Sequence, residues 1–260
     1  MSQVAIFCAD PALLDEALDL SSELDFPIVE TATCEGYLAL LDLSSQGLVL
    51  RPQGAHASGP VSVDFGAGNM RHRRRGGHNE PLGRAVGVGK RECLHIADAT
   101  AGLGRDSFVL ADLGCRVSML ERSATAFALL RNGLSRAQAS EDSWLREVSA
   151  RMTLQRADGR DFLAAMHDRP DVVYLDPMFP ERKKSARVKK EMWLFHHLIG
   201  PDPQESQLLE AALASASWRV VVKRPVKAPP LEGPVPHHDI PGKTIRFDVY
   251  NSQVASGAAP

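Results

Sequence analysis

The stretch LHIADATAGLGRD, residues 94–106, decides the fold of this chain. Its first four residues form an apolar run that predicts a short strand, and a helix-like segment follows at 106–113. Between them lies a glycine loop, Asp98-Ala-Thr-Ala-Gly102-Leu-Gly104. Glycines permit a tight turn and a close approach of the backbone to a ligand. Strand, loop and helix in this order are typical of the nucleotide-binding corner of a doubly wound α/β sheet.

The rest of the second half of the chain repeats this alternation. Apolar, strand-like runs at 116–120, 152–156, 172–175 and 219–222 are separated by helical patterns, which indicates a mostly parallel sheet. The alternating residues 244–250 predict a final antiparallel strand. We therefore expect one main α/β domain at 91–252, followed by a flexible tail at 253–260.

The first 66 residues predict a small α+β domain. A strand is expected at 4–8 and a helix at 11–24, with Asp10 as its N-cap before a proline. Two further runs, 37–43 and 48–51, flank a polar turn and predict a hairpin, and 61–65 predicts another strand. Residues 67–90 then form a basic connector that ends in a helix at 80–88.

Composition places the chain among ordinary globular proteins. Its 260 residues are 44% hydrophobic and 24% charged, with a formal net charge of -2. The four cysteines form no C-x-x-C pair, which argues against a zinc site or a disulfide framework and for a reducing compartment. The same cysteine spacing leads us to expect no metal. Because there is no basic amino-terminal leader and no long apolar run, we expect a cytoplasmic protein without membrane insertion.

Two features of the glycine loop favour S-adenosylmethionine over a dinucleotide. Ser107 stands where a dinucleotide-binding loop has its third glycine, and the acid Asp98 precedes the loop. The methyl donor carries a sulfonium and an ammonium group and has no pyrophosphate, so a nearby carboxylate favours it. Asp98 could instead be a carboxylate that only caps the loop.

Acidic residues also end the neighbouring strands. Glu121 lies about twenty residues past the loop, where an acid typically accepts both hydrogens of a ribose diol, and Arg122 would flank the adenine or anchor the loop. Asp158, followed by Gly159, could accept from the adenine amino group. With Asp98 and Asp176, acids end four successive strands, and ligands of open α/β sheets bind outside these carboxyl ends.

The segment Asp176-Pro177-Met178-Phe179 follows the apolar run 172–175 and predicts the acceptor site. The Asp176 carboxylate and the Pro177 carbonyl would accept the two hydrogens of an exocyclic amine, and Phe179 would stack on the base. This arrangement indicates methyl transfer to an amine of a nucleobase. The alternative is a proline turn with Phe179 buried in the core.

Two basic clusters suggest contacts with nucleic-acid phosphates. One lies in the connector and the other directly follows the acceptor segment. Their members are Arg71, Arg73, Arg74, Arg75, Lys183, Lys184, Arg187, Lys189 and Lys190. On a chain with little net charge, such local patches favour a structured RNA as the partner, although either cluster alone could be a solvated surface run.

Three segments carry a resemblance to a known family. DATAGLGRDSFVLADLGCRVSMLERS, VVYLDPMFPERKKSA and GKTIRFDVYN are similar to the small-subunit ribosomal RNA (guanine-N2)-methyltransferase J family. The resemblance implies a class I, Rossmann-like methyltransferase fold with a mostly parallel seven-stranded sheet, S-adenosylmethionine as donor, and methylation of N2 of one guanosine near the 3′ end of 16S rRNA. It also implies a set of cofactor-lining residues: Arg105, Asp106, Glu121, Arg122, Asp158, Gly159 and Asp176. Met178 replaces the second proline of the commoner motif and leaves the acid, the carbonyl and the ring in place.

Other functions remain open from the residues alone. An acid-Pro-x-aromatic motif also serves adenine N6 in DNA and glutamine amides in proteins. A second alternative is a non-catalytic RNA-binding assembly factor, and a nicotinamide-dependent oxidoreductase is disfavoured by Ser107. The expected partner is 16S rRNA or the small ribosomal subunit, bound by a monomer or weak dimer.

Overall fold

The computed structural model describes residues 3–54, 59–68, 70, 80–177 and 205–252. These residues form two compact units, which are described separately. The first unit contains the described parts of Met1–Asp64 together with Ser123–Arg136. The second contains the described parts of Phe65–Arg122, Ala137–Pro177 and Asp202–Pro260. The domain bounds expected from the sequence stay a prediction.

The first unit is built on a four-stranded sheet with the order β2-β1-β3-β4. Its strands are β1 (Val4–Cys8), β2 (Ile28–Val29), β3 (Ala39–Ser44) and β4 (Gly47–Pro52). Strand β1 runs parallel to both β2 and β3, whereas β3 and β4 form the expected antiparallel hairpin. The strand expected at 61–65 is wrong, because only Val61 bridges to Leu50 in β4.

The helix of this unit begins as the sequence predicts. The Asp10 carboxylate accepts a hydrogen bond from the Ala12 N–H at 3.0 Å, which satisfies a donor that the helix itself leaves unpaired. The first turn, η1 (Pro11–Leu13), is a 3-10 helix and α1 (Leu14–Leu24) continues it. Helix α1 buries Ala17, Leu20 and Leu24, so a single apolar face holds it on the unit.

A segment from the middle of the chain completes the first unit. It is most of helix α5 (Ala124–Gln138). The Asn132 side chain accepts the Leu48 N–H at 3.0 Å, and a Cβ on Gly133 would come within 2.3 Å of a Val63 methyl group. Glycine therefore permits a helix contact here that any larger residue would obstruct.

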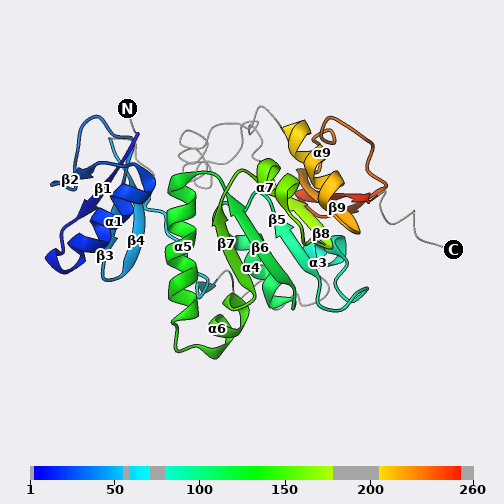
Figure 1. Ribbon diagram of the computed structural model, residues 1–260, viewed down its shortest axis with the longest axis horizontal. Helices are drawn as coiled ribbons and strands as arrows, with labels where there is room; N and C mark the ends of the chain where they lie inside the picture. Colours follow the sequence, from blue (N-terminus) through cyan, green and yellow to red (C-terminus); the bar gives the residue numbers. More distant parts are fainter. Residues whose placement is uncertain (1–2, 55–58, 69, 71–79, 178–204, 253–260) are drawn as a thin grey trace. The chain divides into compact units, whose positions relative to one another are not determined.

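The second unit contains a seven-stranded sheet with the order β10-β11-β9-β8-β5-β6-β7. Figure 1 labels its parallel strands, β5 to β9. The strands are β5 (His95–Asp98), β6 (Arg116–Glu121), β7 (Met152–Arg156), β8 (Val172–Leu175), β9 (Arg219–Pro225), β10 (His238–Pro241) and β11 (Ile245–Asn251). Strands β5 to β9 are parallel, and β10 and β11 are antiparallel. The expected doubly wound, mostly parallel architecture is confirmed.

Helices cover the sheet; the first of them precedes β5, and the others lie between successive parallel strands. They are α3 (Pro81–Val86), α4 (Arg105–Asp112), α6 (Ser143–Ser149), α7 (Gly159–Ala165) and α9 (Glu205–Ser215). The chain moves outward from β5 to β6 and returns from β7 to β8, so right-handed crossovers place α4 and α7 on opposite faces. The order reverses between β5 and β8, and this switch point is where open α/β sheets bind ligands.

Buried aromatic side chains pack these elements together in the core of the second unit. Tyr174 on β8 is almost fully buried, and Phe108 on α4 stacks on Phe65 with ring centroids 4.6 Å apart. Trp144 meets the same phenyl ring edge-on at 5.5 Å and its indole N–H donates to Asp112, so this side chain packs α6 against α4. Among the described helices, none has both the length and the apolar content that a bilayer crossing requires.

Candidate active site

The glycine loop turns sharply between β5 and α4. Gly102 and Gly104 have φ angles of 55° and 70°, which residues with a Cβ rarely adopt. The Gly102 N–H donates to the Glu121 carboxylate at 2.8 Å, so the loop is fixed against the end of β6. Glu121 is itself buried, and Arg122 follows it directly. The loop and the strand-end acid are therefore neighbours, as the sequence suggested.

Asp98 lies buried at the end of β5 and organises the start of the loop. Its carboxylate accepts the Thr100 N–H at 3.1 Å and a hydrogen bond from the Ser107 hydroxyl. Burial raises the pKa of Asp98 to about 7, although both hydrogen bonds act to lower it. These are the contacts of a loop-capping carboxylate, and direct contact with the methyl donor stays a prediction. The bond also gives Ser107 a role that its place in the motif did not reveal.

Asp158 caps the first turn of α7 beside the same loop. Its carboxylate accepts the Arg160 N–H at 2.9 Å and pairs with the Arg160 guanidinium at 2.7 Å. These hydrogen bonds lower the pKa of Asp158, so it is ionised at neutral pH. A Cβ on Gly159 would lie 2.8 Å from the Ala99 carbonyl oxygen, so α7 begins in close contact with the loop. The predicted contact of Asp158 with adenine is not tested by this geometry.

Asp176 joins the acceptor segment to the glycine loop. Its backbone N–H donates to the Thr100 hydroxyl at 2.6 Å, across the switch point between β8 and β5. Pro177 follows it and is buried. Phe179 lies outside the described residues, as do both basic clusters at 71–75 and 183–190.

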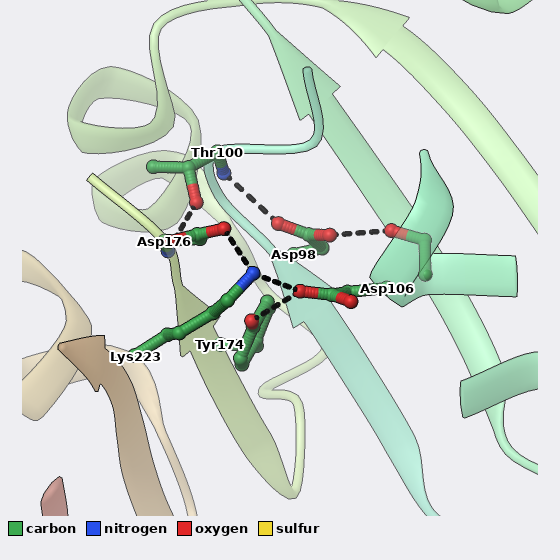
Figure 2. Close-up of polar contacts among 7 residues, drawn as sticks. Asp98, Thr100, Asp106, Tyr174, Asp176 and Lys223 are labelled. Atoms are coloured by element: carbon green, nitrogen blue, oxygen red, sulfur yellow. Dashed lines mark hydrogen bonds and ion pairs between the residues drawn. The ribbon is translucent and has the colours of Figure 1, made fainter. Parts of the chain in front are cut away.

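The structure adds Lys223, which we did not predict. Its ammonium group, on β9, lies 2.7 Å from Oδ2 of Asp106 and 2.7 Å from Oδ2 of Asp176 (Figure 2). The Tyr174 hydroxyl also donates to Asp106, at 2.8 Å. The available signal was a lysine that directly follows the apolar run of residues 220–222, near the carboxyl end of a buried strand.

The charges of this network depend on one another. Removal from water raises the pKa of Asp176, while the Lys223 ammonium opposes that rise. Burial alone would lower the pKa of Lys223, but Asp176 and Asp106 outweigh it and raise that pKa. Burial and the nearby carboxylates, chiefly that of Asp106, raise the pKa of Tyr174, which therefore stays a neutral donor. Lys223 is thus a fixed cation among carboxyl groups.

The chemistry of these groups fits S-adenosylmethionine. A glycine loop leaves room for a ligand close to the backbone, and carboxylates at strand ends suit a ribose diol, an amino group and a positive charge. Arg105 and Asp106 occupy the first turn of α4, directly after the loop. Among the residues that the structure describes, no group of three or more histidine, cysteine, aspartate or glutamate side chains could hold a metal ion.

Comparisons with known proteins agree with this geometry. A family model described as "Putative SAM-dependent methyltransferase" matches residues 26–252. Proteins named ribosomal RNA small subunit methyltransferase J, from Chromobacterium violaceum and Thioalkalivibrio sulfidiphilus, are 47% and 48% identical, each alignment covering 96% of this chain and 97% and 98% of theirs. The crystal structure of a SAM-dependent methyltransferase from Neisseria gonorrhoeae is 33% identical, with a TM-score of 0.74 over 98% of this chain and 97% of that one. The chain belongs to the ribosomal RNA small subunit methyltransferase J family, and its methyl donor is S-adenosylmethionine.

Proposed function

We propose that this methyltransferase transfers a methyl group to the exocyclic N2 amine of one guanosine near the 3′ end of 16S rRNA. The observation that carries the proposal is the position of Asp176, which follows β8 at the switch point and is hydrogen-bonded to the glycine loop. An acceptor held there lies beside the donor site. The names of the relatives supply the ribosomal RNA, and the resemblance of the acceptor segment supplies the guanine amine.

The donor is held by the loop and the strand ends. Glu121 takes the ribose hydroxyls, Asp158 and Gly159 face the adenine, and Asp98 holds the loop through its hydrogen bonds with Thr100 and Ser107. The remaining members of the donor site are Gly102, Gly104, Arg105, Asp106 and Arg122. When bound, S-adenosylmethionine supplies a methyl carbon whose bond to sulfur breaks as the nitrogen lone pair attacks, with the bonding electrons passing to sulfur.

The chain's own contribution at the acceptor is orientation. The Asp176 carboxylate and the Pro177 carbonyl accept the two amine hydrogens and thereby aim the nitrogen lone pair at the methyl carbon. After attack the nitrogen carries a positive charge and releases one proton, which Asp176 accepts or passes to water. Phe179 stacks on the base, which must leave any helix it belongs to.

The partner is held through phosphates. The clusters Arg71 to Arg75 and Lys183 to Lys190 are suited to bind RNA phosphates, since lysine and arginine neutralise backbone charge. We propose further that the protein works in the cytoplasm as a monomer or weak dimer.

Transfer of labelled methyl from S-adenosylmethionine to small ribosomal subunits that lack the modification tests this function. We expect label in N2-methylguanosine of 16S rRNA, lost in Asp176→Ala and strongly reduced in Asp176→Asn. Asp168→Ala is the matched control, because that carboxylate is exposed and, among the residues that the structure describes, pairs only with Arg116, at 3.5 Å. Label in DNA or protein instead, or donor binding with no transfer to any of the three, would reject the proposal.

A further inference from the structure

We propose that Lys223 is a positioning residue for the acceptor amine: it holds Oδ2 of Asp176 in place and leaves Oδ1 to the substrate. This inference rests on the proposed function, in which Asp176 receives an amine hydrogen. Lys223 itself need not touch the substrate. It acts through the orientation and the ionisation of the carboxylate that does.

Strand register brings the two residues together. Strands β8 and β9 are parallel, with Leu175 paired to Val222. Asp176 and Lys223 are the residues that directly follow this pair along the chain, so they lie side by side. The lysine ammonium lies 2.7 Å from Oδ2 of Asp176, and no described group bonds Oδ1. One oxygen of the Asp176 carboxylate is therefore anchored and the other is available as an acceptor. The Asp176 side chain is 36% exposed.

The ammonium is itself anchored on its other side. Oδ2 of Asp106 lies 2.7 Å from it and also receives the Tyr174 hydroxyl. The side chains of Lys223 and Asp106 are only 22% and 14% exposed. A buried ammonium is costly unless paired, so two carboxylates keep it in this position. Figure 2 shows how the lysine reaches between them from its own strand.

The charge of Lys223 matters as much as its position. Within the described part of the chain, the titratable groups that face Asp176 are Asp98 from β5, Asp106 from α4, Tyr174 from β8 and Lys223 from β9. The first two are acids, and Lys223 is the cation among these four. Without the ammonium, desolvation and the neighbouring acids favour protonation of Asp176. A protonated carboxyl group presents a donor where the amine requires an acceptor, so transfer would slow.

The test is a pair of substitutions with opposite expected effects. In Lys223→Met the pKa of Asp176 should rise by at least about one unit, because the opposing cation is lost. In Asp106→Asn it should fall, because a like charge is lost. The carboxyl carbon of Asp176, assigned by its absence in Asp176→Asn, reports both shifts in ¹³C NMR titrations that need no RNA. Lys227→Met, at an exposed lysine beyond β9, should leave the titration unchanged.

Kinetics provide the second readout. The acid limb of the kcat profile should also move to higher pH in Lys223→Met, with kcat on that limb falling about tenfold for each pH unit of the move and recovering at high pH. Lys223→Arg, which keeps the charge, should leave the limb in place. If Lys223→Met melts below the assay temperature, Lys223→Gln takes its place in both measurements.

The outcomes separate the two proposals. An unchanged Asp176 titration in Lys223→Met, or a loss of kcat that is uniform with pH and follows a lowered melting temperature, overturns the inference even if the wild type methylates guanosine. A second outcome is that the pKa of Asp176 shifts in opposite directions in Lys223→Met and Asp106→Asn, but the protein transfers no methyl group to guanosine. This outcome supports the control of Asp176 by Lys223 and rejects only the proposed function.

Discussion

The hydroxyl of Thr100 accepts a hydrogen bond from the backbone N–H of Asp176 at 2.6 Å. Thr100 belongs to the glycine loop and Asp176 begins the acceptor segment, so this bond joins the two halves of the site. The backbone N–H of Thr100 meanwhile donates to Asp98 at 3.1 Å. One residue thus fixes the spacing between the donor loop and the acceptor carboxylate.

Thr100→Val should lower kcat by at least tenfold with little change in S-adenosylmethionine affinity. The substitution keeps the shape of the side chain but leaves the Asp176 N–H without its acceptor, which costs about 1–3 kcal/mol and displaces the carboxylate. Thr100→Ser, which keeps the hydroxyl, should retain most of the activity. Calorimetric titration with the donor and single-turnover transfer separate binding from chemistry. Equal losses in both variants would contradict this role for the hydroxyl.

Ser107→Ala should destabilise the protein more at high pH than at low pH. The Ser107 hydroxyl donates to Asp98, and the ionised carboxylate needs that donor most. Since burial raises the pKa of Asp98 to about 7, the cost should appear as pH rises through 7. Ser149→Ala removes a buried hydroxyl that bonds only helix carbonyl oxygens, so its cost should not vary with pH. Urea unfolding at pH 5.5 and 8.5 compares the two.

Asp98 should also make the wild-type protein less stable as pH rises. The ordinary pKa of an aspartate, which applies to the unfolded chain, is 3.8, and the pKa of Asp98 in the folded protein is about 7. Between these two pH values Asp98 is protonated in the folded state and ionised in the unfolded state. Between pH 5 and pH 8 this single group removes roughly 2–3 kcal/mol of folding stability. Asp98→Asn should flatten that part of the profile. A variant whose unfolding free energy keeps the wild-type slope would contradict the raised pKa.

Gly133→Ala should destabilise the first unit although alanine favours helices by about 1 kcal/mol over glycine. The added Cβ would lie 2.3 Å from Cγ1 and 2.8 Å from the carbonyl oxygen of Val63, and the carbonyl belongs to the backbone. We expect a net loss of about 1–3 kcal/mol in chemical unfolding. Gly59→Ala, with no atom within 4 Å of the new Cβ, should be neutral. A neutral Gly133→Ala would mean that α5 is not packed on Val63.

Replacing both Lys183 and Lys184 with glutamine should weaken RNA binding without affecting the affinity for S-adenosylmethionine. If each contacts a phosphate, the slope of log K against log salt should fall by roughly 0.7–0.9 for each lysine removed. The matched control is the double glutamine variant of Lys227 and Lys243. Filter binding to a 16S rRNA fragment at several salt concentrations measures the slope, and equal slopes in the two variants would remove these lysines from the interface.

The sheet was largely predictable because its central strands β5, β8 and β9 are buried on both faces. Runs such as Val172–Leu175 are continuously apolar, and β7 and β8 have the predicted bounds. Strand β10 was missed, since His238–Pro241 is mostly exposed and carries little apolar signal. The strand expected at 61–65 failed for a different reason: its apolar residues are buried, but only Val61 pairs with another strand.

The site was predictable where residues follow a strand end. Topology alone places Asp98, Glu121 and Asp176 at one edge of the sheet. Lys223 and the Thr100 bond depend on which side chains meet across neighbouring strands, and the order β9-β8-β5 is not visible in a single sequence. Sequence motifs therefore located the acids but not the cation and the hydroxyl that orient them.

The placement of α5 affects how the protein is made. The first unit takes one of its helices from Ser123–Arg136, which the ribosome synthesises only after β5, α4 and β6. During translation the amino-terminal strands are synthesised before that helix, so until it has been made they lack part of their native packing. A truncation that ends near residue 66 would have the same deficiency permanently, and such a fragment should be a poor stand-alone domain.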